Sequence, residues 1–373
     1  MDWNRLIAER AAKIEASGIR KIFDLAATLK DPVNLSIGQP DFDVPEPVKA
    51  SAIAAIREGF NRYTPSAGIP ELREKILSRC AEQYGARPED AVVTSGVSGG
   101  LTLALQALID PGDEVLVPDP YFVSYKHLTA LCEGKPVYYN TYPEFTVDPE
   151  AVERLVSPRT KVLLVMSPAN PTGACLPEAV KQALADLARR HGLILLSDEI
   201  YDLFTYGPRG KSFLAYYPEG TLALNGLSKT ASMTGWRLGW AAGPKALIEN
   251  LTKLQQVTFV CSPSFAQKAA LAAFQSDLSE AVPVYRAKRD RMLAGLREAG
   301  YEAVEPGGAF YLFPKVPPKF GSGQAFVEEA ARRELLLVPG HVFSERDTHF
   351  RISYAAPDEK LARGLEILRK MAR

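Results

Sequence analysis

The sequence predicts an α/β protein built on a mostly parallel sheet, with a smaller α+β module at its C-terminal end. From residue 91 onward, short apolar segments alternate with helical ones, which is typical of parallel strands joined by helices. Within the segment 161–166, the residues after Lys161 form an uninterrupted apolar run, as expected of a parallel strand buried on both faces. A length of 373 residues exceeds one ordinary core and favours two domains.

The expected elements follow along the chain. Helices are expected at 2–16, 47–58, 70–84, 101–108, 148–156, 177–190, 245–256, 286–299, 322–334 and 357–371. Strands are expected at 91–94, 114–117, 137–139, 161–166, 193–196, 221–225, 237–242, 307–313, 335–338 and 350–354. A further long helix starts near residue 266, and Pro283 is expected to interrupt it because proline lacks a helix-forming amide. The first helix and the extended stretch after it suggest an arm that docks elsewhere.

Composition excludes several functional classes. The formal net charge is zero, so no basic excess indicates nucleic acid or an anionic membrane as a partner. The first residues lack the pattern of a signal peptide, and no apolar run approaches the roughly 20 residues that a membrane helix needs. The four cysteines are scattered without a paired spacing, which favours reduced thiols in the cytoplasm. The four histidines show no metal-ligand spacing, and no metal is expected.

The most informative stretch is residues 227–240, a polar segment between two apolar strands. It contains Ser228, Lys229 and Arg237. Desolvation near the interior would lower the pKa of Lys229 and make its neutral amine a nucleophile able to form a Schiff base. Ser228 and Arg237 are suited to binding a phosphate. The alternative is a solvated loop lysine, the ordinary state of this residue type.

A glycine-rich turn at 95–100 lies between an expected strand and a helix. Free amides and the helix dipole at such a position favour an anion, and Gly96, Val97 and Ser98 are placed to cradle a single phosphate. The turn is neither a dinucleotide fingerprint nor a phosphate loop. A tight turn also needs glycine for purely structural reasons.

Three more strands are followed by candidate side chains. Phe122 is suited to stacking on a planar ring, Asn170 lies in a turn directly after a strand, and a carboxylate such as Asp198, which stands three residues before Tyr201, can keep a ring nitrogen protonated. Ligands in open parallel sheets bind at the C-terminal ends of strands, where these residues are expected. The structural alternatives are a core aromatic, a turn and a helix cap. Glu199 is interpreted as structural.

Arg351 lies within an apolar strand, and a buried arginine needs an anion. A protein carboxylate is the common partner for such a side chain. Two irregular loops also stand out, one beginning at Gly38 and one containing Tyr63. On their own, both loops are explained as connectors before helices.

Together these segments resemble the class I/II pyridoxal phosphate-dependent aminotransferases, the aspartate aminotransferase superfamily, from about residue 35 to residue 355. The Ser-Lys pair, the Met-Thr-Gly-Trp-Arg-Leu-Gly run and the Asn-Pro-Thr-Gly motif match most closely. The resemblance implies fold type I, with a mostly parallel seven-stranded sheet sandwiched by helices and a smaller α+β domain. The expected division is 1–40 as an N-terminal arm and part of the small domain, 41–275 as the large cofactor-binding domain, and 276–373 as the small domain.

The resemblance also implies a role for each candidate residue. Lys229 would bind pyridoxal 5'-phosphate (PLP) covalently and then act as the base, with Asp198 and Tyr201 tuning the ring. The cofactor would further contact Gly96, Val97, Ser98, Phe122, Asn170, Ser228 and Arg237, while Gly38, Asn170 and Arg351 would bind the substrate. Tyr63 would complete the neighbouring site of a homodimer.

The implied activity is transfer of an amino group from an L-amino acid to a 2-oxo acid, by a ping-pong mechanism through a Lys229 aldimine. A β-eliminating carbon–sulfur lyase or a cyclopropane-forming synthase on the same fold is the enzymatic alternative. A transaminase-like DNA-binding regulator is the non-enzymatic one, disfavoured because only about 35 residues precede the first motif. No second arginine is placed by motif for an acidic substrate, and Tyr125, Phe310 and Ile37 leave aromatic or aliphatic substrates open.

Overall fold

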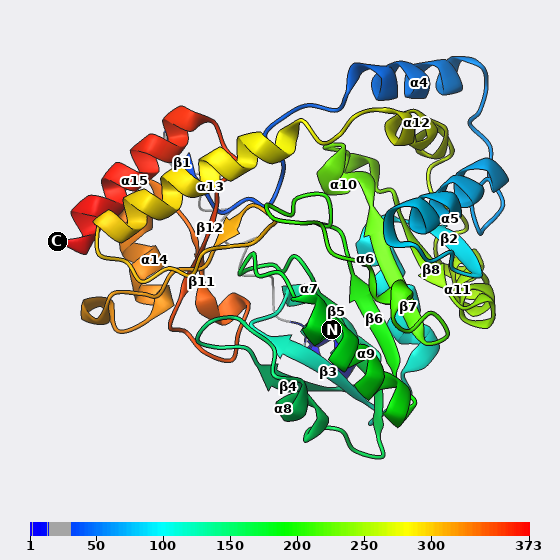
Figure 1. Cartoon of the computed structure of the whole chain (residues 1–373), viewed down its shortest axis with the longest axis horizontal. Helices are drawn as coiled ribbons and strands as arrows, with labels where there is room; N and C mark the ends of the chain where they lie inside the picture. The colour runs from blue at the N-terminus through cyan, green and yellow to red at the C-terminus, as the bar shows by residue number, and fades with distance from the viewer. Residues whose placement is uncertain (2, 13, 15–30) are drawn as a thin grey trace.

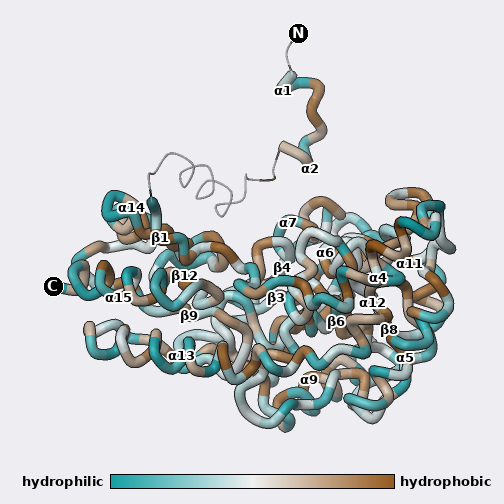
Figure 2. The backbone as a smooth tube through the Cα atoms, turned by 90° about the horizontal axis from the view of Figure 1, so that it is seen from above, coloured by the Kyte–Doolittle hydropathy of each residue, from teal (hydrophilic) through white to brown (hydrophobic). Residues whose placement is uncertain are grey.

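The computed structural model describes residues 1, 3–12, 14 and 31–373 (Figure 1). Within the described N-terminal part, two short helices, α1 (Trp3–Leu6) and α2 (Glu9–Ala12), stand where one helix at 2–16 was expected. Residues 2, 13, 15 and 16 of that expected helix lie outside the described residues. Figure 2 shows α1 and α2 outside the body of the molecule, with α2 next to α7 (Val123–Leu131).

The centre of the molecule is a seven-stranded, mostly parallel sheet, as predicted. Its strands lie in the order β2 (Asp90–Thr94), β8 (Gly239–Gly243), β7 (Thr221–Gly226), β6 (Ile194–Asp198), β5 (Thr160–Met166), β3 (Glu114–Asp119) and β4 (Lys135–Asn140). Strand β8 is antiparallel to both of its neighbours, and the other pairs are parallel. The apolar runs are buried on both faces, which explains their lack of polar alternation.

Helices cover both faces of this sheet (Figure 1). One face packs against α6 (Gly96–Leu108), α7 and α11 (Lys245–Thr258). The other packs against α9 (Glu178–His191) at β3, β5 and β6, and against α5 (Pro70–Tyr84) and α12 (Ser264–Gln275) at β2, β7 and β8. Helix α4 (Glu46–Arg57) lies on α12, and α8 (Pro149–Glu153) lies on α9.

A second group of elements joins the two ends of the chain. Strand β1 (Val33–Asn34) pairs in parallel with β10 (Leu335–Leu336), and β12 (Phe350–Ser353) pairs antiparallel with β11 (Val338–Pro339) and β9 (Tyr311–Leu312). Helices α13 (Ala281–Glu298), α14 (Gly323–Arg332) and α15 (Asp358–Ala372) complete this α+β module. The chain therefore has the predicted α/β fold with a smaller α+β part.

Several local expectations need correction. The strand expected at 307–313 is limited to β9, and the one expected at 335–338 is divided between β10 and β11. Helix α6 begins at Gly96, so the glycine-rich segment is its first turn and not a preceding turn. Lys229 lies on a short helix, α10 (Leu227–Thr230), and not in a loop. Pro283 does not interrupt a helix: α12 ends at Gln275, and proline sits in the first turn of α13, where no amide donor is needed. Helix α7 was not predicted.

Gly239 holds β8 against the start of α6. A Cβ built on this residue would lie 2.8 Å from the carbonyl carbon of Gly96, 2.9 Å from the carbonyl oxygen of Asn225 and 2.9 Å from the amide nitrogen of Val97. All three atoms belong to the backbone, which cannot move aside cheaply. Glycine is therefore required where the end of β7 and the first turn of α6 meet.

We expect Gly239→Ala to lower the free energy of unfolding by about 2 kcal/mol or more, because overpacking against backbone forces strands and helix apart. Thermal unfolding of the purified protein measures the loss. Gly235→Ala is the matched control, since a Cβ there meets nothing within 4 Å. An equal unfolding midpoint for the two variants would contradict the close approach.

Candidate active site

A cavity of about 220 Å³ lies at the C-terminal ends of the parallel strands, between the sheet and the α+β module. It brings together most of the predicted site residues: Gly38, Val97, Ser98, Phe122, Asn170, Asp198, Tyr201, Ser228, Lys229, Arg237 and Arg351. Four lining residues were not predicted: Met166, Ile200, Thr234 and Tyr311. Two predicted residues do not line it. Gly96 lies just behind Arg237, and Tyr63 is 85% exposed on the surface.

Lys229 reaches the cavity from α10, which follows directly on strand β7. Its Nζ donates a hydrogen bond of 2.6 Å to the carbonyl oxygen of Gly38 and lies 5.9 Å from the ring centroid of Tyr201. Burial, reinforced by the positive charges of Arg351 and Arg237, lowers the pKa of Lys229 to about 8. Roughly a tenth of the amine is therefore neutral and nucleophilic at pH 7, far more than for an ordinary lysine.

Asp198 ends strand β6 and is 2% exposed. It accepts hydrogen bonds from the hydroxyl of Tyr125 (2.8 Å) and from the backbone amide of Ile200 (3.2 Å). Burial raises the pKa of Asp198 to about 6, and these hydrogen bonds together with Lys229 oppose the rise. The carboxylate is therefore largely ionised at neutral pH, as a partner of a protonated ring nitrogen has to be.

Tyr125 was named from the sequence among the residues that leave aromatic or aliphatic substrates open, but it does not line this cavity. Its side chain is fully buried, and its hydroxyl donates to Asp198. Phe310 is likewise fully buried, against the rings of Tyr201 and Tyr311. The missed signal was helix α7, which begins just after Phe122 and carries Tyr125 in its first turn.

The first turn of α6 forms an anion-binding group with Arg237. The amides at this helix start have no side-chain cap, so they are available to an anion. Gly96 has a φ of +68°, and a Cβ there would lie 2.8 Å from Nη2 of Arg237. Arg237 is held by a 2.9 Å hydrogen bond from Nη1 to the carbonyl oxygen of Thr234. Ser228 lines the cavity beside this group.

Arg351 is 2% exposed and lies between the rings of Tyr311 and Phe343, each centroid 4.6 Å from its guanidinium carbon. Nη1 donates to Oδ1 of Asn170 (3.0 Å) and Nη2 to the carbonyl oxygen of Ser36 (2.6 Å). Its Nε has no hydrogen-bond partner. Within the described residues no carboxylate forms an ion pair with Arg351, so its charge is available to a substrate carboxylate.

Gly38 closes the cavity opposite Lys229. A Cβ on Gly38 would overlap the hydroxyl of Tyr311, so the backbone comes this close only as glycine. The Tyr311 and Tyr201 hydroxyls are 2.6 Å apart. Burial raises the pKa of Tyr201 well above its usual value, which keeps this phenol protonated and able to donate.

These residues fit PLP. The uncapped turn of α6 with Arg237 and Ser228 suits its phosphate, the ionised Asp198 suits its ring nitrogen, and the neutral amine of Lys229 suits its aldehyde. Phe122 supplies an aromatic wall.

Among the described residues, no cluster of His, Cys, Asp and Glu is arranged to bind a metal ion. The described part of the chain also has no helix long and apolar enough to cross a membrane.

Comparison with known proteins agrees with this chemistry. Residues 30–368 match the family model described as aminotransferase class I and II. A probable aspartate aminotransferase of Methanocaldococcus jannaschii is 37% identical over 98% of this chain and 100% of its own length. An aromatic-amino-acid aminotransferase of Thermococcus litoralis is 36% identical over 98% of each chain. The solved aspartate aminotransferase of Thermus thermophilus with maleate superimposes with a TM-score of 0.95, at 38% identity over 98% of this chain and 99% of that one.

The lowered pKa of Lys229 predicts an unusual pH profile for its amine in the cofactor-free protein. Only the neutral amine is acylated, so labelling by acetic anhydride, followed by peptide mass spectrometry, is expected to rise about tenfold per pH unit and to level off above pH 8. N-acetyllysine amide, with a pKa of about 10.4, is the reference amine and continues to rise past pH 9. A Lys229 profile that follows the reference would contradict the assignment.

Proposed function

The chain belongs to the aminotransferases of class I and II, and on that premise we propose how its cavity residues share the reaction and which amino acids they accept. It is a PLP-dependent enzyme that transfers an amino group from an amino acid to a 2-oxo acid. One observation supports the proposed roles above all others: Lys229, Asp198 and Arg351 face a single cavity from three separate elements. None of the relatives named above supports the carbon–sulfur lyase alternative.

In this proposal, four groups of residues hold the cofactor. The first-turn amides of α6, contributed by Gly96, Val97 and Ser98, bind its phosphate together with Ser228 and Arg237. Asp198 holds the proton on the ring nitrogen, Tyr201 and Asn170 donate to the phenolic oxygen, and Phe122 stacks on the ring. Asn170 is suited to donating because its amide oxygen already accepts from Arg351, which leaves its Nδ2 as the free group.

The remaining residues act on the substrate. When bound, PLP supplies an electron-withdrawing ring that makes the α-proton of the amino acid removable. Arg351, which lines the cavity and has no carboxylate partner among the described residues, binds the α-carboxylate. Lys229, once its amine is free, would accept the α-proton and return it to the cofactor carbon on the other side of the substrate nitrogen. Gly38, whose carbonyl oxygen accepts from Nζ of Lys229, lies where it can orient that amine and border the substrate.

We further propose that this chain prefers amino acids with uncharged side chains. The cations that line the cavity are Lys229, Arg237 and Arg351, and each already has a role, respectively in covalent bonding, phosphate binding and α-carboxylate binding. Within one chain, the described residues that line the cavity therefore supply no further cation for a second carboxylate. A buried carboxylate without a partner costs several kcal/mol, which disfavours aspartate and glutamate.

A half-reaction panel tests both the activity and this preference. Each of the twenty amino acids is mixed with PLP-loaded enzyme, and the cofactor absorbance and the 2-oxo acid product are followed. We expect kcat/KM for phenylalanine, tyrosine or leucine to exceed that for aspartate by about tenfold or more, roughly 1.4 kcal/mol. Lys229→Ala is the inactive control. The highest kcat/KM for aspartate would overturn the preference, whereas absence of any 2-oxo acid would overturn the residue roles.

We propose a homodimer in which Tyr63 of each chain completes the other chain's site. Tyr63 is 85% exposed and lies in a loop outside its own chain's cavity. Large apolar side chains are exposed nearby in sequence, Ile53 (48%) and Ile56 (47%) on α4, and others are exposed around the end of α11, at Val257 (80%) and Phe259 (43%). Exposed apolar surface of this kind is typical of a contact between subunits.

The domain division and the cellular location are also part of what we propose for this chain. The division into residues 1–40, 41–275 and 276–373 is supported by the pairing of β1 with β10, which ties the N-terminal segment to the C-terminal module. The break between α12 and α13 lies close to the proposed boundary. A reducing location, the cytoplasm, is supported by the four cysteines, all of which are free thiols.

A hybrid-dimer experiment tests the placement of Tyr63. Tyr63→Phe alone is expected to weaken PLP binding about tenfold, because a hydrogen bond to a charged phosphate is lost. Mixing it with Lys229→Ala protein creates hybrid dimers in which one site combines an intact Lys229 with the partner's Tyr63. Half of the sites in these hybrids should regain wild-type affinity, measured by cofactor fluorescence. Hybrids with no high-affinity site would show that Tyr63 acts within its own chain.

A further inference from the structure

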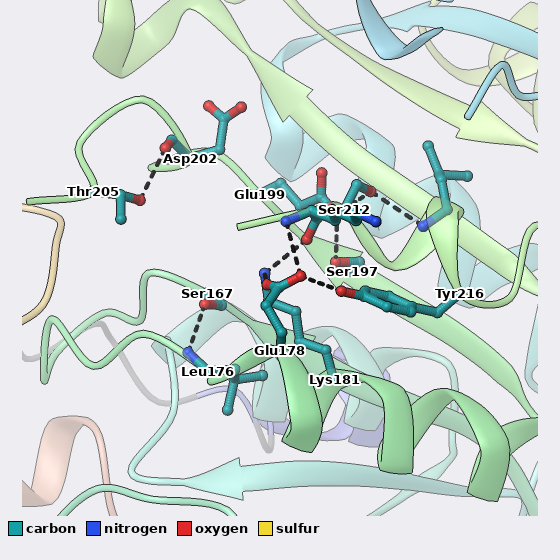
Figure 3. A network of polar contacts seen from close by, with 12 residues as sticks. Ser167, Leu176, Glu178, Lys181, Ser197, Glu199, Asp202, Thr205, Ser212 and Tyr216 are labelled. Carbon is teal, nitrogen blue, oxygen red and sulfur yellow. Dashed lines mark hydrogen bonds and ion pairs between the residues drawn. The ribbon is translucent and has the colours of Figure 1, made fainter. Parts of the chain in front are cut away.

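A second, larger cavity of about 410 Å³ lies behind the active site, on the opposite side of strand β6. Side chains alternate along a strand, so Asp198 faces the cofactor cavity while Ser197 and Glu199 face this one. Its other walls come from the start of α9 and from the loop that follows β6 (Figure 3). None of the proposed catalytic or cofactor-binding side chains lines it.

Two ion pairs are formed between side chains that line this cavity. Glu178 pairs with Lys181 (3.1 Å) and also accepts from the hydroxyl of Tyr216, as Figure 3 shows. Asp202 pairs with Arg209 and also accepts from the hydroxyl of Tyr84. The charges of the two acids and the two bases are therefore balanced within the protein.

Glu199 is the charged side chain at the base of the cavity that has no such partner. It is 5% exposed, and both of its side-chain hydrogen bonds, from Ser197 (2.9 Å) and Ser212 (2.6 Å), reach the same oxygen, Oε1 (Figure 3). Among the described residues, no hydrogen bond reaches Oε2 and no cation lies within ion-pair distance of the carboxylate. A buried carboxylate with an open oxygen is costly unless a donor or a cation meets it.

Lys211 is a basic residue of this cavity that, like the acidic Glu199, has no ion-pair partner among the described residues. Its side chain is exposed. Once the two ion pairs between lining side chains are set aside, a buried carboxylate (Glu199) and an exposed lysine (Lys211) remain among the residues that line the cavity. This is the charge pattern that a small zwitterion complements.

We propose that this cavity is a second binding site, distinct from the active site, for a small zwitterion of the amino acid class. The ammonium group of the ligand donates to Oε2 of Glu199, and its carboxylate faces Lys211. The two serine hydroxyls that reach Oε1 hold the Glu199 carboxylate in place for this contact. Transamination at Lys229 does not use this second cavity.

N,N-dimethylglycine is a suitable probe because its tertiary ammonium keeps one N–H donor but cannot condense with an aldehyde. Titrated calorimetrically into PLP-loaded enzyme at pH 8, where Glu199 is ionised because burial raises its pKa only to about 7, it should bind at one saturable site per chain. Glu199→Gln should weaken binding about tenfold, since a charge-assisted hydrogen bond is lost. Lys211→Gln, an exposed change that keeps the fold, should weaken it about threefold.

Arg351→Gln separates the two sites, because it removes the carboxylate-binding group of the active site alone. Binding that persists in Arg351→Gln and weakens in both Glu199→Gln and Lys211→Gln supports the proposal. Binding lost only in Arg351→Gln would assign the probe to the active site and overturn it. Absence of saturable binding, or equal affinity in the wild type and both second-site variants, would overturn it as well.

Discussion

The structure depends on keeping three ionisable side chains enclosed together. Lys229, Asp198 and Arg351 face one cavity, and among the described residues none of them forms an ion pair. Taking a charge out of water costs several kcal/mol unless it is paired. Burial therefore shifts the pKa of Lys229 down to about 8 and that of Asp198 up to about 6, so both remain close to the pH at which the enzyme must use them. The extensive apolar packing on both faces of the sheet stabilises the fold and offsets the cost of burying these charges.

Strand β6 separates two polar cavities, one on each face of the sheet. Its alternation places Asp198 on the cofactor side and Ser197 and Glu199 on the other side. Each buried acid is held by hydroxyl groups: Asp198 by Tyr125, and Glu199 by two serines. Hydroxyls stabilise a carboxylate without neutralising it, so each acid retains its charge for another group. Two adjacent acids in one motif can therefore have unrelated roles.

The α+β module completes the site that the sheet begins. It contributes Arg351 and Tyr311, while the segment beside β1 contributes Ser36 and Gly38. Arg351 donates to Asn170, which follows β5, and to Ser36, so a single guanidinium connects three distant parts of the chain. The substrate carboxylate would bind at this junction. The position of the module against the sheet therefore sets where the Arg351 guanidinium lies relative to Lys229 and Asp198. That position is set by packing and not by any local motif.

The sequence by itself determined the fold class and the identity of most candidate site residues. Uninterrupted apolar runs such as 162–166 are typical of strands buried on both faces, and polar residues directly after parallel strands are expected to meet at one sheet edge. Helices with strong periodicity, such as α5 and α9, lie within a residue or so of their expected bounds. These features are local, and local patterns reveal them.

The tertiary structure decided what the local pattern leaves open. It showed that Tyr125 serves Asp198, that Arg351 has no protein carboxylate among the described residues, and that Glu199 faces a cavity of its own. Each of these facts depends on contacts between residues far apart in the chain, such as the 181 positions that separate Asn170 from Arg351. Burial, and with it every shifted pKa, is likewise a property of the packed molecule. A sequence names the chemical groups, and only packing decides which of them meet and how far each is removed from water.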